Sequence, residues 1–273
     1  MKSKRKKRFK KRERKGIFLI PNLFTSASLF GGFYAIIASI NGRYEAAAVA
    51  IIVSCILDGL DGRVARFTNT TSHFGAEFDS LSDLVAFGVA PGILAYQWTL
   101  VHFGRLGWLA AFMYVICGAL RLARFNVQKN VVSSSYFKGL PIPAAACFIA
   151  ALVLFSRAIS PIPEKNPILI ITTVYILSFF MVSSIEYLAF KEIDIRNRKP
   201  FNVLVSVILI MVVIAYKPTV MLFFIMFAYI WSGPFMILYR KYIKRHSKKT
   251  AIADNDSAEF VDNPELIEQG EVE

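Results

Sequence analysis

The chain has 273 residues and a formal net charge of +13 at pH 7, yet 55% of its residues are hydrophobic and only 19% are charged. This composition, with a mean hydropathy of +0.49, excludes a protein that is water-soluble throughout and is typical of an integral membrane protein. The positive charge lies at the ends and in short connections between apolar runs, which excludes nucleic-acid binding as the main role. The three cysteines each lie inside an apolar run and favour neither a disulfide framework nor a metal site.

The first segment of the chain is strongly basic. Residues 1–16 contain eleven Lys and Arg and a single acid, Glu13. Because like charges at this density repel one another, we expect the segment to lack fixed structure and to lie against anionic lipid headgroups on the cytoplasmic side. The apolar run from Ile17 to Ile40 is too long for the core of a cleaved signal peptide and is predicted to be the first transmembrane helix.

Apolar runs long enough to cross about 30 Å of hydrocarbon divide residues 17–239, the predicted membrane catalytic domain, into about eight transmembrane helices. The expected ranges are 17–40, 45–66, 75–100, 108–125, 140–158, 167–189, 201–215 and 219–239. The prediction is an all-α polytopic membrane protein with a six-helix catalytic core and two further helices. Because only Tyr216-Lys217-Pro218 separates the last two ranges, six and seven spans remain alternatives.

The positions of the cationic residues orient these helices. With a cytoplasmic amino terminus, five of the 32 Lys and Arg residues fall on the outer side, namely Arg43, Arg105, Arg157, Lys165 and Lys217. This asymmetry obeys the positive-inside rule and predicts a multi-pass protein of the cell (cytoplasmic) membrane with both termini in the cytoplasm. Residues 240–273 are predicted to form a cytoplasmic tail, first basic and then acidic and disordered.

Four aspartates occur where isolated charges are costly: Asp58, Asp61, Asp79 and Asp83. A carboxylate near hydrocarbon must be paired, hydrated or metal-bound, so we interpret these residues as functional. Helical spacing places the first two on one face of the second helix and the last two on one face of the third. The short connection 67–74 makes those helices antiparallel neighbours, so the four carboxylates should converge around cations. The alternative is that each Asp caps a helix end or faces a polar loop.

The residues around the aspartates indicate the chemistry. Oxygen ligands with no His or Cys nearby favour Mg²⁺ or Mn²⁺, and carboxylate-bound magnesium is the usual partner of a substrate pyrophosphate. A nucleoside diphosphate ester is therefore the predicted substrate. Gly62 and Gly75 lack side chains where a nucleotide would approach the backbone, and Arg66 supplies a cation for phosphate.

The sequence Asp58-Gly-Leu-Asp61-Gly62-Arg-Val-Ala65-Arg66, eight residues, then Gly75-Ala-Glu-Phe-Asp79-Ser-Leu-Ser-Asp83 resembles the CDP-alcohol phosphotransferase motif DxxDGxxAR(x8)GxxxDxxxD without departure. Pro21-Asn22-Leu23-Phe24-Thr25 resembles the start of the family's first helix. The resemblance implies a helical membrane enzyme that transfers a phosphatidyl or similar group from a CDP-linked donor to an alcohol and releases CMP.

The resemblance also implies roles for individual residues. Asp58, Asp61, Asp79 and Asp83 would bind two ions of Mg²⁺ or Mn²⁺, and Asp83 would also act as the base. The residues expected to bind the CDP-lipid are Asn22, Thr25, Gly62, Ala65, Arg66 and Gly75. A homodimer is also expected from the resemblance.

Residues outside the motif bear on the acceptor alcohol. Residues 79–91, 118–126 and 137–144 resemble the family members that use serine, which implies CDP-diacylglycerol and L-serine as substrates. Arg121 and Arg124 are three residues apart near the cytoplasmic end of the fourth helix, where a guanidinium would bind the serine carboxylate or the donor phosphate, with Asn126 adding a hydrogen bond. The alternative is that both arginines are anchors that reach toward the headgroups.

Two other functions remain open at this point. A related enzyme would use glycerol phosphate or inositol phosphate as the acceptor. A cation transporter would place acids near the middle of the bilayer on helices broken by Gly or Pro, whereas these four aspartates lie nearer the cytoplasmic ends of their helices.

Overall fold

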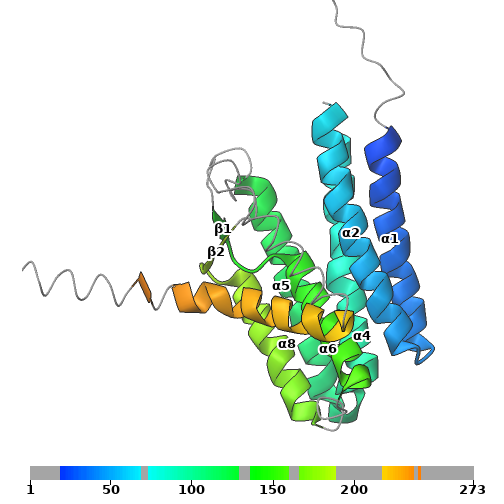
Figure 1. The fold of residues 1–273 in the computed structure, drawn as a ribbon, viewed down its shortest axis with the longest axis vertical. Coiled ribbons are helices and arrows are strands. Elements are labelled where there is room, and N and C mark those ends of the chain that lie inside the picture. Colours follow the sequence, from blue (N-terminus) through cyan, green and yellow to red (C-terminus); the bar gives the residue numbers. More distant parts are fainter. Residues whose placement is uncertain are drawn as a thin grey trace, which may run out of the picture.

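The computed structural model describes residues 19–68, 73–128, 136–159, 166–188, 217–236 and 239–240. Helices account for nearly all of them, with one short two-stranded ribbon (Figure 1). The elements in chain order are α1 (Leu19–Ile40), α2 (Tyr44–Thr68), α3 (His73–Asp83), a π-helical segment (Leu84–Val89), α4 (Ala90–Trp98), a 3₁₀ turn (Leu100–Phe103), α5 (Arg105–Gln128), β1 (Tyr136–Lys138), α6 (Ile142–Ala158), α8 (Pro167–Val182), β2 (Glu186–Leu188) and the helix Pro218–Met236. The predicted all-α polytopic membrane fold is confirmed, and the ribbon is an addition to it.

The membrane character is visible in the helix lengths. Four described stretches are long and apolar enough to cross a bilayer, namely Asn22–Ile40, His73–Trp98, Arg105–Val127 and Pro218–Met236. The apolar helices α6 and α8 are shorter. The basic segment 1–16, the predicted seventh helix 201–215 and the tail beyond residue 240 lie outside the described residues, so the number of spans stays a prediction.

Helices α1 and α2 form an antiparallel hairpin that also packs on the third span. The Ser28 hydroxyl donates a hydrogen bond to the carbonyl oxygen of Ser54, with an O···O distance of 3.1 Å. Gly32 makes the contact with the third span possible, because a Cβ at this position would lie 2.5 Å from the Cα of Ala86. Helix α1 therefore sits close to both elements that carry the aspartates.

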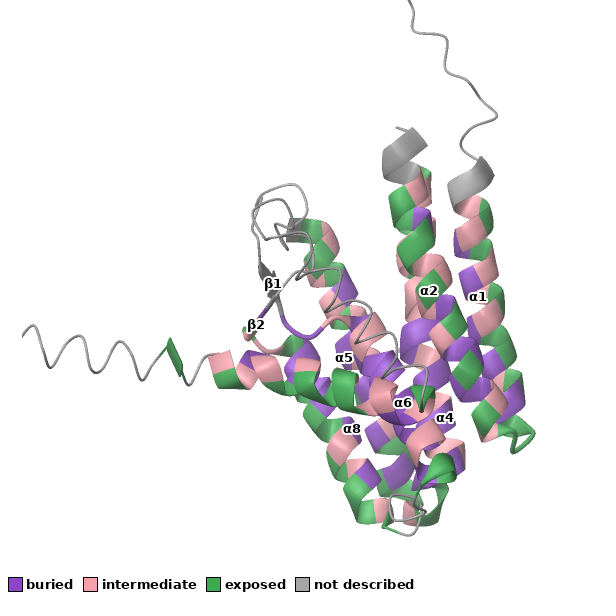
Figure 2. Ribbon diagram, in the orientation of Figure 1, coloured by how far each residue is buried: buried purple, intermediate pink, exposed green. Residues whose placement is uncertain are grey.

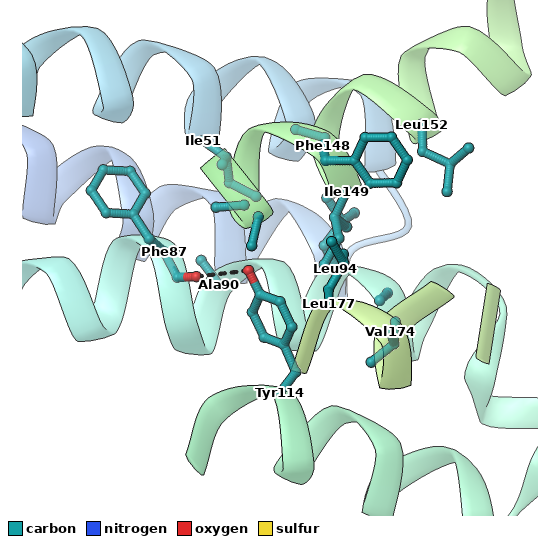
Figure 3. Close-up of a cluster of buried hydrophobic side chains, with 14 of the residues drawn as sticks. Ile51, Phe87, Ala90, Leu94, Tyr114, Phe148, Ile149, Leu152, Val174 and Leu177 are labelled. Atoms are coloured by element: carbon teal, nitrogen blue, oxygen red, sulfur yellow. Dashed lines mark hydrogen bonds between the residues drawn. The ribbon is translucent and has the colours of Figure 1, made fainter. Parts of the chain in front are cut away.

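The third span is continuous from His73 to Trp98 but is not a uniform α-helix. The π-helical segment Leu84–Val89 interrupts it directly after Asp83, whereas the sequence predicted one regular helix over 75–100. The buried Tyr114 of α5 donates its hydroxyl to the carbonyl oxygen of Phe87 inside this segment, with an O···O distance of 3.1 Å (Figure 3). Single-turn π segments are rare and occur frequently at functional sites.

The core lies where α2, α4, α5, α6 and α8 meet. Figure 2 shows buried residues concentrated there and exposed residues on the outer flank of α1. Helix α6 is buried over most of its length and supplies Phe148, Ile149 and Leu152 to the cluster in Figure 3. Between these large side chains α6 has buried alanines, which allow neighbouring backbones to approach closely. The three cysteines are free, and two of them are buried.

The sequence prediction was wrong at the end of the sixth range, 167–189, because α8 ends at Val182. Ser183 takes an extended conformation, and its hydroxyl donates to the carbonyl oxygen of Phe180 over 2.8 Å. The chain then enters β2, which pairs antiparallel with β1 so that Phe137 lies opposite Tyr187. A serine that bonds the backbone at a helix end competes with further helical turns, which accounts for the early stop.

Candidate active site

Three of the four predicted aspartates form a tight cluster. Carboxylate oxygens of Asp58, Asp61 and Asp79 all lie within 4.8 Å of one another. The first two come from the carboxyl-terminal part of α2 and the third from α3. Asp61 is buried, and the other two side chains are half-buried. Negative groups at this separation repel one another strongly unless a cation lies between them, so the cluster could hold a metal ion.

Helix α1 holds the cluster in place through Thr25. The buried Thr25 hydroxyl donates a hydrogen bond to Oδ2 of Asp61 over 2.9 Å. The hydroxyl of Ser82 in α3 donates in turn to the backbone carbonyl of Thr25, with an O···O distance of 3.1 Å. These two bonds connect α1, α2 and α3 at the level of the carboxylates and orient Asp61 toward Asp58 and Asp79.

Asp83 lies beside the cluster rather than within it. Its carboxyl group is within hydrogen-bonding reach of Asp58 but does not belong to the set of three mutually close carboxylates. Asp83 is the last residue of α3, and the π-helical segment starts at the next residue. The position allows a role for Asp83 that differs from that of the other three.

The two predicted arginines have different surroundings. Arg121 is close enough to Asp83 and to Tyr229 for electrostatic interaction with both. Arg124 instead donates a hydrogen bond to the carbonyl oxygen of Val182, at 3.4 Å, and so binds the end of α8. The structure therefore brings Arg121 within electrostatic range of Asp83, whereas the contact it records for Arg124 is with the end of α8.

Asn126 serves as a link between helices in this structure. Its Nδ2 donates a hydrogen bond to the hydroxyl oxygen of Ser80 over 2.9 Å, which ties α5 to α3 one residue beyond Asp79. Arg124 thus connects α5 to α8, and Asn126 connects α5 to α3. The sequence pattern did not indicate this connecting role.

The residues predicted to bind the CDP-lipid lie on α1, α2 and α3. Gly62 is exposed, and a Cβ added there would meet no atom within 4 Å among the described residues. Asn22 and Gly75 are half-buried. Ala65 and Arg66 belong to α2, but their side chains lie outside the described residues. Among the described residues, the space directly beside the Gly62 backbone is therefore open.

Sequence reasoning missed Ser82, Tyr187 and Tyr229. Ser82 is part of the motif region, and its place one residue before Asp83 was a possible signal. Tyr229 lies in the helix Pro218–Met236, more than a hundred residues after Arg121, and no local pattern links the two. Only the tertiary fold brings Tyr229 to the site.

The structure is a bundle of apolar helices that carries a carboxylate cluster at the helix ends. Residues 18–181, more than half of the chain, match the CDP-alcohol phosphatidyltransferase family, and this stretch contains all four aspartates. The chain belongs to the CDP-alcohol phosphatidyltransferase family.

Several named enzymes are similar to this chain in sequence. The chain is 44% identical over 177 residues to the CDP-diacylglycerol–serine O-phosphatidyltransferase of Helicobacter pylori, a match that covers 65% of this chain and 75% of the relative. It is 38% identical over 178 residues to the Bacillus subtilis protein of the same name, covering 65% of this chain and 94% of the relative. It is also 38% identical over 170 residues to the archaetidylserine synthase of Methanothermobacter thermautotrophicus, covering 62% of this chain and 69% of the relative.

The donor atoms of the cluster fit a divalent metal ion. All three groups are carboxylates, and oxygen ligands of this kind suit hard cations of the size of Mg²⁺ or Mn²⁺. The bond from Thr25 to Asp61 is the kind of outer contact that fixes the orientation of a metal-binding carboxylate.

Proposed function

We propose that the protein transfers a phosphatidyl group from CDP-diacylglycerol to L-serine and releases CMP. The observation that carries the reaction type is the convergence of Asp58, Asp61 and Asp79, with Asp83 beside Asp58. The relatives from Helicobacter pylori and Bacillus subtilis are named for serine transfer, and this supports L-serine as the acceptor. Membership in the family also sets aside the cation-transporter alternative.

In the proposed reaction, the serine hydroxyl oxygen forms a bond to the phosphorus that carries the diacylglycerol. The bond from that phosphorus to the bridging oxygen of the pyrophosphate breaks, and CMP leaves with the bridging oxygen. Asp83 takes the proton of the serine hydroxyl as the attack begins. Its place beside Asp58, outside the three-carboxylate cluster, suits a group that exchanges a proton.

The aspartate cluster would hold two ions of Mg²⁺ or Mn²⁺, with Asp58, Asp61, Asp79 and Asp83 as ligands. When bound, such ions neutralise the pyrophosphate and the negative charge that develops on the leaving CMP. The residues that hold the donor are proposed to be Asn22, Thr25, Gly62, Ala65, Arg66 and Gly75. The open surface at Gly62 supports a nucleotide there.

We place the acceptor near Arg121. This guanidinium lies within electrostatic range of Asp83, so a serine carboxylate bound to it would place the serine hydroxyl in the region of the proposed base. The contact of Arg124 with Val182 and that of Asn126 with Ser80 favour a supporting role for these two residues.

The location of the reaction follows from the charge pattern. We propose that the protein lies in the cytoplasmic membrane, with both termini and the aspartates on the cytoplasmic side, because this orientation obeys the positive-inside rule. The basic residues within 1–16 would bind anionic lipids. We further propose that the protein is a homodimer, as the resemblance to the family implies.

The test is the reaction of the purified full-length protein in detergent or vesicles. CDP-diacylglycerol is offered with labelled L-serine, glycerol phosphate or inositol phosphate in parallel, and the lipid products are separated by thin-layer chromatography. We expect labelled lipid from serine alone, with one CMP released per lipid formed. Labelled lipid from glycerol phosphate or inositol phosphate, and none from serine, would overturn the serine assignment while leaving the reaction type intact.

A further inference from the structure

The helix Pro218–Met236 lies beyond the family-matched residues 18–181 but packs directly on them. In Figure 1 it is the orange helix that runs crosswise over α6 and α8. Its Phe223 ring stacks on Phe155 of α6, with ring centroids 4.5 Å apart. Its Trp231 ring meets Phe180 of α8 edge-on at 6.3 Å. Aromatic contacts about two turns apart, at Phe223 and Trp231, thus fix the helix against α6 and α8.

The rotation of this helix is fixed by Tyr187 of β2. Tyr187 is fully buried, and its hydroxyl donates to the carbonyl oxygen of Ile230, with an O···O distance of 3.3 Å. Its ring can approach because Gly233 has no side chain, since a Cβ there would lie 2.6 Å from the ring. The Tyr187 ring also packs against that of Tyr229, with centroids 5.8 Å apart. Through Tyr187, the β1–β2 ribbon thus fixes the position of Tyr229.

Tyr229 stands beside Arg121. The two side chains are close enough to interact electrostatically, and Arg121 interacts in the same way with Asp83. The guanidinium carbon lies 6.0 Å from the centroid of the Phe125 ring. Among the described residues, the buried Nε of Arg121 has no hydrogen-bond partner. A buried guanidinium donor left without a protein partner indicates a place for a negatively charged ligand.

We propose that Tyr229 and Arg121 together bind the carboxylate of the amino-acid acceptor, so that the helix Pro218–Met236 contributes to acceptor specificity. This proposal rests on the proposed serine transfer. A guanidinium offers two parallel donors to a carboxylate, and a phenol hydroxyl offers a third without adding charge. Arg121 lies within electrostatic range of Asp83, the aspartate outside the three-carboxylate cluster, so the acceptor would bind on the Asp83 side of that cluster.

The experiment compares Tyr229→Phe with the wild-type full-length enzyme, using L-serine and L-serinamide as acceptors. Serinamide keeps the reactive hydroxyl but lacks the carboxylate. We expect the KM for serine to rise about three- to tenfold, because one hydrogen bond to a charged group is lost. The KM for CDP-diacylglycerol should change less than about twofold, because the lost hydrogen bond is proposed to bind the acceptor and not the donor. The preference for serine over serinamide should fall by the same factor as the KM for serine rises.

Two further variants complete the test. Tyr175→Phe, at an exposed tyrosine of α8, is the matched control and should leave both KM values unchanged. In the double variant Arg121→Lys with Tyr229→Phe, the loss of serine preference should be smaller than the product of the single losses, because both residues bind one group. An unaltered KM for the CDP-lipid confirms that each variant is folded.

If the wild-type enzyme makes lipid from serine but Tyr229→Phe leaves the ratio of serine to serinamide use unchanged, Tyr229 is a packing residue and the inference is overturned. The inference also fails if the thermal stability of the variant falls while that ratio stays constant. A wild-type enzyme that makes no lipid from serine overturns the proposed function together with this inference, so the two failures are distinct.

Discussion

The hydroxyl of Thr25 in α1 donates a hydrogen bond of 2.9 Å to Oδ2 of Asp61 in α2, and both residues are buried. The bond joins positions 36 residues apart and is a direct contact of the first helix with the carboxylate cluster. A carboxylate can bind a metal ion productively only if its oxygens are held in one orientation. The Thr25 hydroxyl supplies this restraint from outside the cluster.

Thr25→Val should therefore weaken metal binding without removing a ligand. Valine keeps the shape of threonine but cannot donate, and loss of such an outer contact typically lowers metal affinity about 10- to 100-fold. The measurement is the concentration of Mg²⁺ or Mn²⁺ that gives half-maximal CMP release. Thr25→Ser should retain most of the affinity. Ser26→Ala is the control, because this exposed hydroxyl bonds only the carbonyl oxygen of Asn22 in its own helix. An unshifted metal titration in Thr25→Val would show that the bond has no effect on the ligands.

Chelation should abolish CMP release, and added Mg²⁺ or Mn²⁺ should restore it, since three close carboxylates repel a pyrophosphate unless cations are present. Asp58→Asn and Asp79→Asn should reproduce the effect of chelation and weaken donor binding, because an amide is a neutral and poorer ligand. Glu77→Gln, at an exposed acid on α3, is the control and should behave as wild type. Full activity in excess chelator would remove the basis for a metal-dependent reaction.

Asp83→Asn tests the assignment of the base. Turnover should fall by about 100-fold or more, since general-base catalysis typically contributes 10² to 10⁴. The affinity for CDP-diacylglycerol should fall much less, because Asp83 lies outside the three-carboxylate cluster. Single-turnover release of CMP and equilibrium binding of the donor measure the two quantities separately. Near-normal turnover in the variant would reduce Asp83 to a structural or metal-site acid.

Arg121→Lys and Arg124→Lys should differ in their effect on the KM for serine. Lysine keeps the charge but loses the two parallel donors, so the KM for serine should rise by about tenfold in Arg121→Lys while that for CDP-diacylglycerol stays nearly constant. Arg124→Lys should leave the KM for serine unchanged and lower thermal stability slightly, because Arg124 binds the last carbonyl of α8. A rise in the KM for the CDP-lipid in Arg121→Lys would indicate a donor-phosphate role. Unchanged kinetics in both variants would remove Arg121 from the acceptor site.

Much of the fold could be predicted because its signals are local. Apolar runs mark most of the helices, and the expected range 140–158 agrees with α6 to within two residues at its start. The approach of Asp58 and Asp61 to Asp79 was also predictable, because helical spacing and a short connection determine which faces meet. These features depend on residues that are close together in the sequence.

The remaining features depend on contacts between distant segments. Nothing in the order of residues distinguishes Arg121 from Arg124. The two differ only in the tertiary structure, where Arg124 bonds the carbonyl oxygen of Val182 and Arg121 lies within electrostatic range of Asp83. The pairing of Tyr136–Lys138 with Glu186–Leu188 likewise depends on the packing of α6 and α8, which lie between the two strands in the chain. Three-residue strands are too short to show a period of their own.

The π-helical segment Leu84–Val89 lies between α3 and α4 in the third span. Because of this segment, the side chains of α3 are rotated about the helix axis relative to the positions that one regular helix continuing into α4 would give them. Deleting one residue from this segment would restore regular α-helical winding and turn the amino-terminal half by about 100° relative to the other half. Leu94 and Trp98 of α4 belong to the buried core, so α4 would keep its position, and Asp79 would rotate away from Asp58. A chain one residue shorter at this point should fold around the same core and lose the carboxylate cluster, so the number of residues between Asp83 and Ala90 sets the geometry of the candidate site.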